Sequence, residues 1–126
     1  MFQGCTALTE VIFADENNIT SIGSSAFASC TSLPSIAIEQ SVFNGCRALS
    51  DVTLGNNVTS IGITSFYNTA LTGITLPESL TVIGQSAFQK SPLAGELVLP
   101  AGVKSIGSQA FAETQLTGIA IPAGTT

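Results

Sequence analysis

The chain has 126 residues, of which 44% are hydrophobic and 9% are charged, and its net charge is −5 with three basic residues. This balance excludes an intrinsically disordered chain, which needs low hydrophobicity and high net charge. It also argues against nucleic acid and anionic lipid as partners, because clustered cations bind both. Membrane insertion is not expected, since no stretch approaches the roughly 20 apolar residues of a span.

Phenylalanines recur along the chain at nearly fixed intervals of 25, 16, 23, 22 and 23 residues. Six of the seven Phe residues form this series, namely Phe2, Phe27, Phe43, Phe66, Phe88 and Phe111. A Leu follows each of them five or six residues later. A fixed period of this length indicates a tandem array of one short unit, stacked into a solenoid.

Each unit carries two short apolar patterns. The first begins at that Leu and ends in an apolar–any–apolar alternation, as in residues 71–77 and 116–122, which predicts a half-buried strand. The second ends in Ile-Gly and predicts a short strand closed by a turn. It occurs at residues 19–23, 58–62, 80–84 and 103–107. The Ala-Phe part that follows predicts a tight helical turn that carries Phe into the core.

One unit is shorter than the others, and one loop is longer. The interval from Phe27 to Phe43 lacks the second pattern after Ile38, so we expect a flattened back there. Residues 15–18 form an acidic and amide-rich loop that should protrude. Because no unit can bury its own apolar face, we expect Phe to stack on Phe, Ile on Ile and Leu on Leu in one continuous core.

The combined pattern resembles the BspA-like leucine-rich repeat over the whole chain, most fully in residues 22–33 and 76–88. The resemblance implies an α/β leucine-rich-repeat solenoid, mostly β and right-handed, with a parallel concave sheet, short second strands and helical or 3-10 turns. It would hold about 5.5 repeats of about 23 residues. Both ends cut through the repeat, so we expect residues 1–126 to be a single domain from a longer array.

Members of this family are surface or secreted proteins, and their known role is adhesion. The resemblance therefore implies a noncatalytic protein-binding module, with a host matrix, plasma or microbial surface protein as its partner. It implies no cofactor, no metal and no catalytic residue. Our main alternative is a self-assembling structural solenoid, a homo-oligomer through uncapped ends or sheet edges. An ice-binding Thr array is a poorer fit, because Thr-x-Thr ranks are missing.

Two columns of side chains should face outward from the predicted concave sheet. Strand alternation predicts the first column as Ile12, Ala37, Thr53, Thr75, Val98 and Ala120. It predicts the second column as Glu10, Ser35, Asp51, Gly73, Glu96 and Gly118. The columns form either a solvated sheet or a flat, weakly polar docking strip for protein, without the aromatic and Arg anchors of binding hot spots.

Other candidate sites are weaker. The absence of His removes the usual Ser-His-Asp and Cys-His arrangements, and the chain has no Cys-x-x-Cys pair for zinc. Cys5, Cys30 and Cys46 each stand three residues after a Phe, which predicts a buried ladder of small residues, with a disulfide possible. Residues 15–18 lack the alternating spacing of a calcium loop, and Asn18 and Asn57 head glycosylation patterns that a Thr-rich repeat produces by chance.

Overall fold

Most of the short apolar patterns form short parallel strands in the structure of the chain, a computed structural model that describes residues 5–7, 21–22, 36–38, 41–52, 54 and 58–126. The strand predicted at residues 71–77 does not form, and that segment has only an isolated bridge at Thr75. The strands are β1 Ser21–Ile22, β2 Ile36–Ile38, β3 Asp51–Val52, β4 Val58–Ile61, β5 Val82–Ile83, β6 Ala94–Val98, β7 Ser105–Ile106 and β8 Gln115–Ala120. Each of their pairings is parallel.

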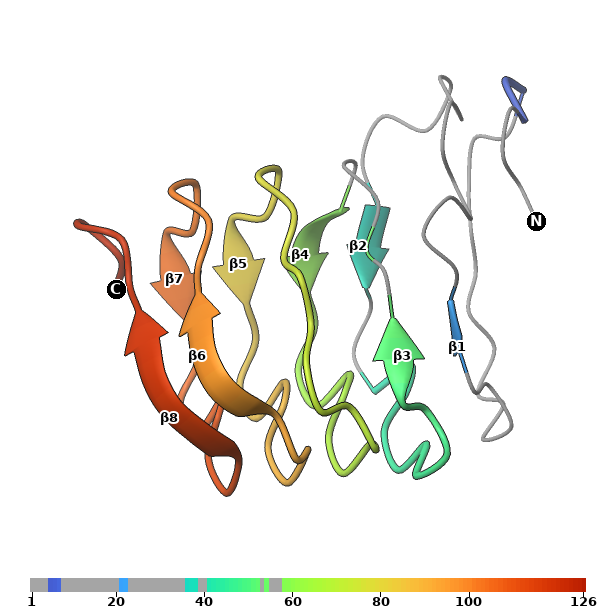
Figure 1. Ribbon diagram of the computed structural model, residues 1–126. Coiled ribbons are helices and arrows are strands. Elements are labelled where there is room, and N and C mark those ends of the chain that lie inside the picture. The colour runs from blue at the N-terminus through green and yellow to red at the C-terminus, as the bar shows by residue number, and fades with distance from the viewer. Residues whose placement is uncertain (1–4, 8–20, 23–35, 39–40, 53, 55–57) are drawn as a thin grey trace.

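The strands lie in two rows that run in opposite directions (Figure 1). One row is a four-stranded sheet in the order β2-β4-β5-β7, and the other contains the two-stranded sheets β1-β3 and β6-β8. Ser60 lies beside Val82, which lies beside Ser105, so neighbours along β4, β5 and β7 are 22 or 23 residues apart. The chain therefore returns to the same place once per Phe interval. We call the stretch from three residues before one Phe to four residues before the next a coil, and residues 108–126 the last coil.

The Phe rings stack in the interior, as predicted. Ring centroids are 5.1 Å apart for Phe43 and Phe66, 5.2 Å for Phe66 and Phe88, and 5.4 Å for Phe88 and Phe111. The first three rings are fully buried, whereas Phe111 is half-buried. The Leu residues of the first pattern join them, and Leu49, Leu71 and Leu93 are almost completely inaccessible.

Phe43, Phe66, Phe88 and Phe111 each lie in a hydrogen-bonded turn, and the described residues contain no helix, so the prediction of helical turns is wrong. The residues two before and two after each of these four Phe residues have φ between 52° and 73°, as at Ser86 and Lys90, which interrupts any right-handed helical run. The amides of Phe43, Phe66 and Phe88 also donate to the next coil, each over 2.8 Å. A ladder between coils therefore replaces the hydrogen bonds that a helix would make.

The short unit changes the place of one predicted strand. We expected Ala37 in the row of Val98 and Ala120, but β2 pairs with β4 and sets Ala37 beside Ser60 in the other row. The physical reason is the missing second pattern. The Ile-Ala-Ile segment comes directly before the turn of Phe43, so it takes the place in the ladder that the Ile-Gly strands β4, β5 and β7 fill in later coils. The Ile-Gly strand β1 instead pairs with β3 in the other row.

The cysteines follow the prediction in part. Cys46 is buried in the core, three residues after Phe43. Cys5 is an exposed free thiol, so it does not belong to a buried ladder. Cys30, Asn18, Asn57 and residues 15–18 lie outside the described residues.

Candidate functional site

The C-terminal end of β6 shows the alternation that the sequence predicts, whereas β8 does so less clearly, because Ile119 is exposed as well as Ala120. Val98 is 70% exposed, whereas its chain neighbours Leu97 and Leu99 are 7% and 4% exposed. The parallel pairing sets Glu96 beside Gly118 and Val98 beside Ala120. Glu96 leans over its neighbour, because a Cβ built on Gly118 would lie 3.5 Å from Glu96 Cγ. The face thus combines one acid, one large apolar side chain and two small residues.

The remaining residues of the predicted strip have different outcomes. Gly73 and Thr75 are exposed and precede the buried Leu76 in a segment that forms no strand. Asp51 is exposed on β3, where it pairs with Ser21. Ala37 belongs to the other row of strands, as described above. Glu10, Ile12, Ser35 and Thr53 lie outside the described residues. The structure therefore brings Glu96, Val98, Gly118 and Ala120 together as one surface.

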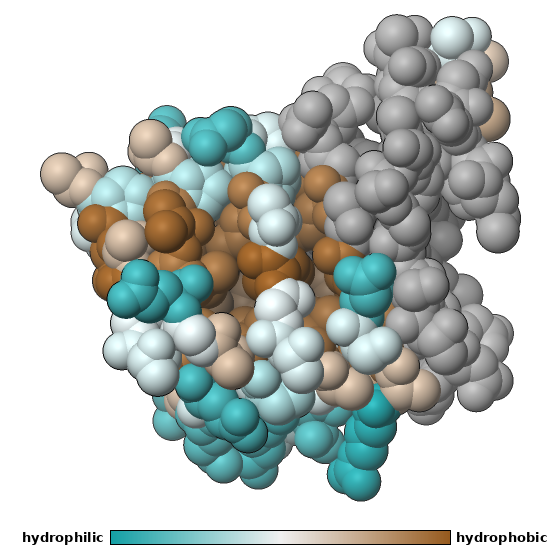
Figure 2. All heavy atoms as spheres, viewed as in Figure 1, coloured by the Kyte–Doolittle hydropathy of each residue, from teal (hydrophilic) through white to brown (hydrophobic). Residues whose placement is uncertain are grey.

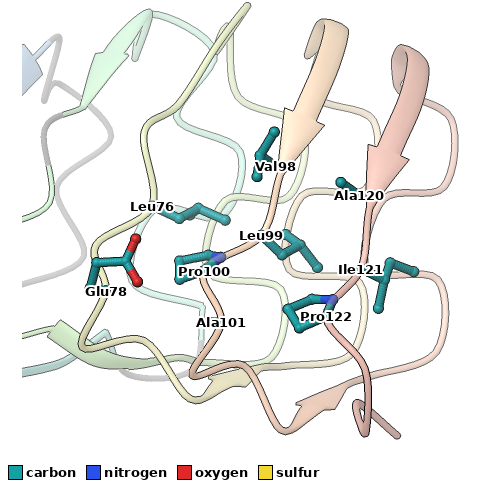
Figure 3. Close-up of a pocket in the computed structure, with 9 residues that line it drawn as sticks. All are labelled: Leu76, Glu78, Val98, Leu99, Pro100, Ala101, Ala120, Ile121 and Pro122. Carbon is teal, nitrogen blue, oxygen red and sulfur yellow. The ribbon is translucent and has the colours of Figure 1, made fainter.

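An open groove of about 430 Å³ continues this surface beyond the ends of β6 and β8. Eight of its nine lining residues have apolar side chains. The lining residues are Leu76, Glu78, Val98, Leu99, Pro100, Ala101, Ala120, Ile121 and Pro122. Figure 2 shows hydrophobic residues gathered in a band at this level of the molecule. In Figure 3, Leu76 points toward Leu99, and the Glu78 carboxylate lies on the side of Pro100. We call this feature the Leu-Pro groove.

Three consecutive Pro turns build the groove. The amides of Leu80, Val103 and Thr125 donate to the carbonyls of Pro77, Pro100 and Pro122, over 3.0, 3.1 and 3.4 Å. Because Pro has no N–H, it suits the place where a strand leaves its ladder. Gly102 lets adjacent turns approach closely, since a Cβ there would lie 3.2 Å from the backbone oxygens of both Glu78 and Leu80.

The described cations lie away from the Leu-Pro groove, whereas acids lie both at the groove and elsewhere. Glu78 is the one charged residue that lines the groove, and Glu96 lies on the adjoining strand. Lys90 lies at the Phe turns, with Nζ 5.6 Å from the centroid of the Tyr67 ring. A hydrogen bond to Tyr67 and the Glu113 charge raise the pKa of Lys90, so it stays a cation far from the groove. Arg47 follows the turn of Phe43, and Lys104 precedes β7 in the other row.

Our sequence reasoning missed most of the groove. It selected Val98 and Ala120 from strand alternation but not Glu78, Pro100 or Ile121, which follow the strands. A usable signal was present, because an apolar–Pro step ends three consecutive strand patterns, at Leu76-Pro77, Leu99-Pro100 and Ile121-Pro122. Repeated steps at one period place the same turn side by side in neighbouring coils.

The part of the chain that the structure describes holds no group of three or more His, Cys, Asp and Glu residues that could bind a metal ion. Over the same residues, no helix has the length and hydrophobicity to cross a membrane. What the site offers chemically is a shallow apolar surface with carboxylates at its edge. Such a surface can bind another molecule by contact and charge.

Parallel strands stacked at a period of 22 or 23 residues, over a core of aligned Leu and Phe rows, define a leucine-rich-repeat protein. The family model for the BspA-type leucine-rich repeat region matches the chain in six copies, over residues 1–42 and 34–126. The chain belongs to this family. Proteins with leucine-rich repeats are generally protein-interaction modules, and this family is often found at the surface or secreted.

Two solved structures show the same fold. A leucine-rich repeat protein from Bacteroides ovatus ATCC 8483 is 31% identical, with a TM-score of 0.63 over 82% of this chain and 29% of that one. A T. pallidum leucine-rich repeat protein is 33% identical, with a TM-score of 0.61 over 84% of this chain and 54% of that one. The chain thus spans 29% and 54% of the lengths of these two relatives. No curated protein matches the sequence.

Proposed function

We propose that residues 1–126 form one right-handed solenoid domain of about 5.5 repeats that binds protein without catalysis. Its role is adhesion at a cell surface or after secretion, with a host matrix, plasma or microbial surface protein as the ligand. No cofactor takes part. The family supports this role, since leucine-rich repeats are generally interaction modules.

One observation carries the proposal: the two most exposed large hydrophobic residues of the described chain line the same groove. Val98 is 70% exposed and Ile121 is 54% exposed, and both line the Leu-Pro groove. Scattered surface hydrophobic residues are ordinary, but a contiguous apolar surface marks a binding site. The ladders that hold it preorganise the surface, which reduces the entropy lost on binding.

Binding to a panel of purified matrix, plasma and bacterial surface proteins, immobilised on a biosensor, tests the proposal. Val98→Asp should abolish the capture of whichever protein the wild type binds, because it places a charge in the apolar surface. Val82→Asp is the matched control, since Val82 is also an exposed strand Val, 39% accessible, but lies on β5 in the other row. Equal loss or equal retention in both variants would refute the groove as the binding surface.

A second candidate function, self-assembly, rests on the last coil. Ser86, Phe88 and Lys90 each donate an amide to the next turn, over 3.0, 2.8 and 3.1 Å. The equivalent amides of Gln109, Phe111 and Glu113 have no acceptor among the described residues. Three aligned donors beside a half-buried Phe form a template for a turn from a second copy, in a head-to-tail arrangement that does not close.

Light scattering over a concentration series separates this candidate from the first. Head-to-tail assembly predicts an average mass that grows continuously with concentration, because a heterologous contact has no natural end point. A mass that stays at the monomer value of 12.8 kDa over the whole series would exclude self-assembly. Binding to an immobilised protein without such growth would leave the adhesive role as the proposal.

A further inference from the structure

We infer that the Leu-Pro groove binds an extended protein segment in which Lys or Arg alternates with aliphatic residues. This inference rests on the proposed protein-binding function and specifies the chemistry of the partner. The aliphatic side chains would occupy the groove, and the cationic groups would lie at the carboxylates of Glu78 and Glu96. An acidic segment or a purely polar one would not fit.

The shape and lining of the groove select aliphatic side chains. Leu76 and Leu99 form its buried part and are 8% and 4% exposed, while Val98 and Ile121 stand above them. No aromatic residue lines the groove, so stacking of a planar group on a ring is not available there. An apolar side chain placed over these residues gains roughly 25 cal/mol for each Å² removed from water. Aliphatic groups of the size of Leu or Val suit this surface.

The charges around the groove select a cation. Glu78 is exposed, and no described residue forms a hydrogen bond or ion pair with its carboxylate. Glu96 is exposed two residues before Val98, so both face outward from β6. None of the chain's three cations lines the groove. An acidic face without counter-charges attracts a basic partner and repels an acidic one.

The backbone at the groove favours recognition through side chains rather than addition of a strand. Pro100 and Pro122 have no N–H to donate, and their carbonyls already accept from Val103 and Thr125. A bound segment therefore cannot extend the β6-β8 ladder at this level. The groove therefore selects a bound segment by the apolar contacts and the charges of its side chains.

The neighbouring coils supply a matched control for the acidic residue. Glu78, Ala101 and Ala123 occupy the same position in three stacked Pro turns, directly after Pro77, Pro100 and Pro122. Glu78→Ala therefore gives this turn the residue that the other two turns already carry, with no expected effect on folding. Ala101→Glu makes the opposite change, since Ala101 also lines the groove and is exposed.

Fluorescence anisotropy of a labelled octapeptide with alternating Leu and Lys tests the inference on the full chain. We expect Glu78→Ala to weaken binding about two- to five-fold, the range of an exposed ion pair, and Ala101→Glu to strengthen it by a similar factor. Glu113→Ala, an exposed acid at the Phe turns, should change nothing. A peptide with Ser for Leu and a peptide with Glu for Lys should both bind more weakly than the parent peptide.

Several results would overturn the inference. Equal affinity for the Ser-containing peptide would mean that net charge alone attracts the peptide. Equal affinity for the Glu-containing peptide would mean that the groove does not distinguish a cation from an anion. An unchanged affinity in Glu78→Ala would remove the carboxylate from the site. Protein capture that depends on Val98 without any preference for the Lys peptide would keep the proposed function and reject this partner.

Discussion

The central coils and the last coil have the same sequence pattern but different burial. Phe66 and Phe88 are stacked on both sides and are fully buried, whereas Phe111 has one stacked neighbour and is half-buried. Ile119 is 36% exposed, although its ladder partner Leu97 is 7% exposed. Burial in this molecule therefore comes from the next coil rather than from the coil itself, which is how repeat arrays gain stability.

The largest expected effect is the removal of a stacked ring. Phe88→Ala should lower the free energy of unfolding by roughly 3–5 kcal/mol, because the cavity lies between two rings that cannot close over it. Phe111→Ala should cost roughly half as much, since one side of that ring is already accessible. Urea unfolding followed by circular dichroism measures both. Equal losses of unfolding free energy would mean that Phe111 is as buried in solution as Phe88, and would contradict the difference in burial between the last coil and the central coils.

Close approach of the backbone between coils gives the next effect. A Cβ on Gly84 would lie 2.7 Å from the carbonyl carbon of Gly62 and the amide nitrogen of Ile63, both backbone atoms that the ladder holds in place. Gly84→Ala should therefore destabilise the chain by about 3 kcal/mol, the upper range for overpacking. Gly73→Ala is the control, because the residue is exposed and a Cβ added to it would meet nothing within 4 Å. A smaller loss at Gly84 than at Gly73 in thermal unfolding would contradict the packing of the central coils.

The hydroxyl group three residues after Phe makes more hydrogen bonds in a central coil than in the last coil. Ser91 Oγ donates to the carbonyl of Phe66 over 2.6 Å and lies 2.8 Å from Thr69 Oγ1. At the equivalent place in the last coil, Thr114 Oγ1 donates to the carbonyl of Phe111 over 2.8 Å. Ser91→Ala leaves buried groups of two residues without a partner and should cost about 2 kcal/mol.

Thr114→Ala should cost about 1 kcal/mol or less, because solvent reaches that site and replaces the hydrogen bond. The same urea titration gives both values. A loss of unfolding free energy in Thr114→Ala as large as that in Ser91→Ala would indicate that solvent is excluded from the last coil as fully as from the central coils.

The sequence predicted the interior better than the connections. Rows of Phe and Leu could be read directly, because a stacked array repeats one residue type at one depth, and Phe43, Phe66, Phe88, Leu71 and Leu93 all lie where predicted. The placement of Ala37 could not be read in the same way. An Ile-Ala-Ile segment fits either row of strands, and its place depends on which ladder position the shortened unit leaves empty.

The turns and the groove depended on information that local pattern does not contain. Ser86, Lys90 and five of their equivalents adopt positive φ without being Gly, in the last coil as well as in the central coils. Such a conformation has no reliable residue signature. The strip at Val98 and Ala120 followed from alternation, whereas Glu78 joins it through the stacking of three turns. The role of that residue emerges only when the coils are set side by side.

The smallest expected effect comes from the residues with positive φ, and it should be the same in a central coil and in the last coil. Lys90 in a central coil and Glu113 in the last coil have φ of 62° and 57°, a left-handed conformation that is strained for side chains with a Cβ. Replacing either by Gly removes this strain but adds freedom to the unfolded chain. We expect a net stabilisation of up to about 1 kcal/mol for each variant.

Gly45→Ala is the reverse experiment. Gly45 holds the equivalent position with φ of 73°, and nothing lies within 4 Å of a Cβ placed there, so backbone strain is its main cost. It should destabilise the chain by about 1 kcal/mol in differential scanning calorimetry. Because φ is a local property, Lys90→Gly and Glu113→Gly should shift the midpoint equally, unlike the Phe and hydroxyl variants. A gain in one coil only would show that stacking, and not the residue's own backbone, controls the strain of the turn.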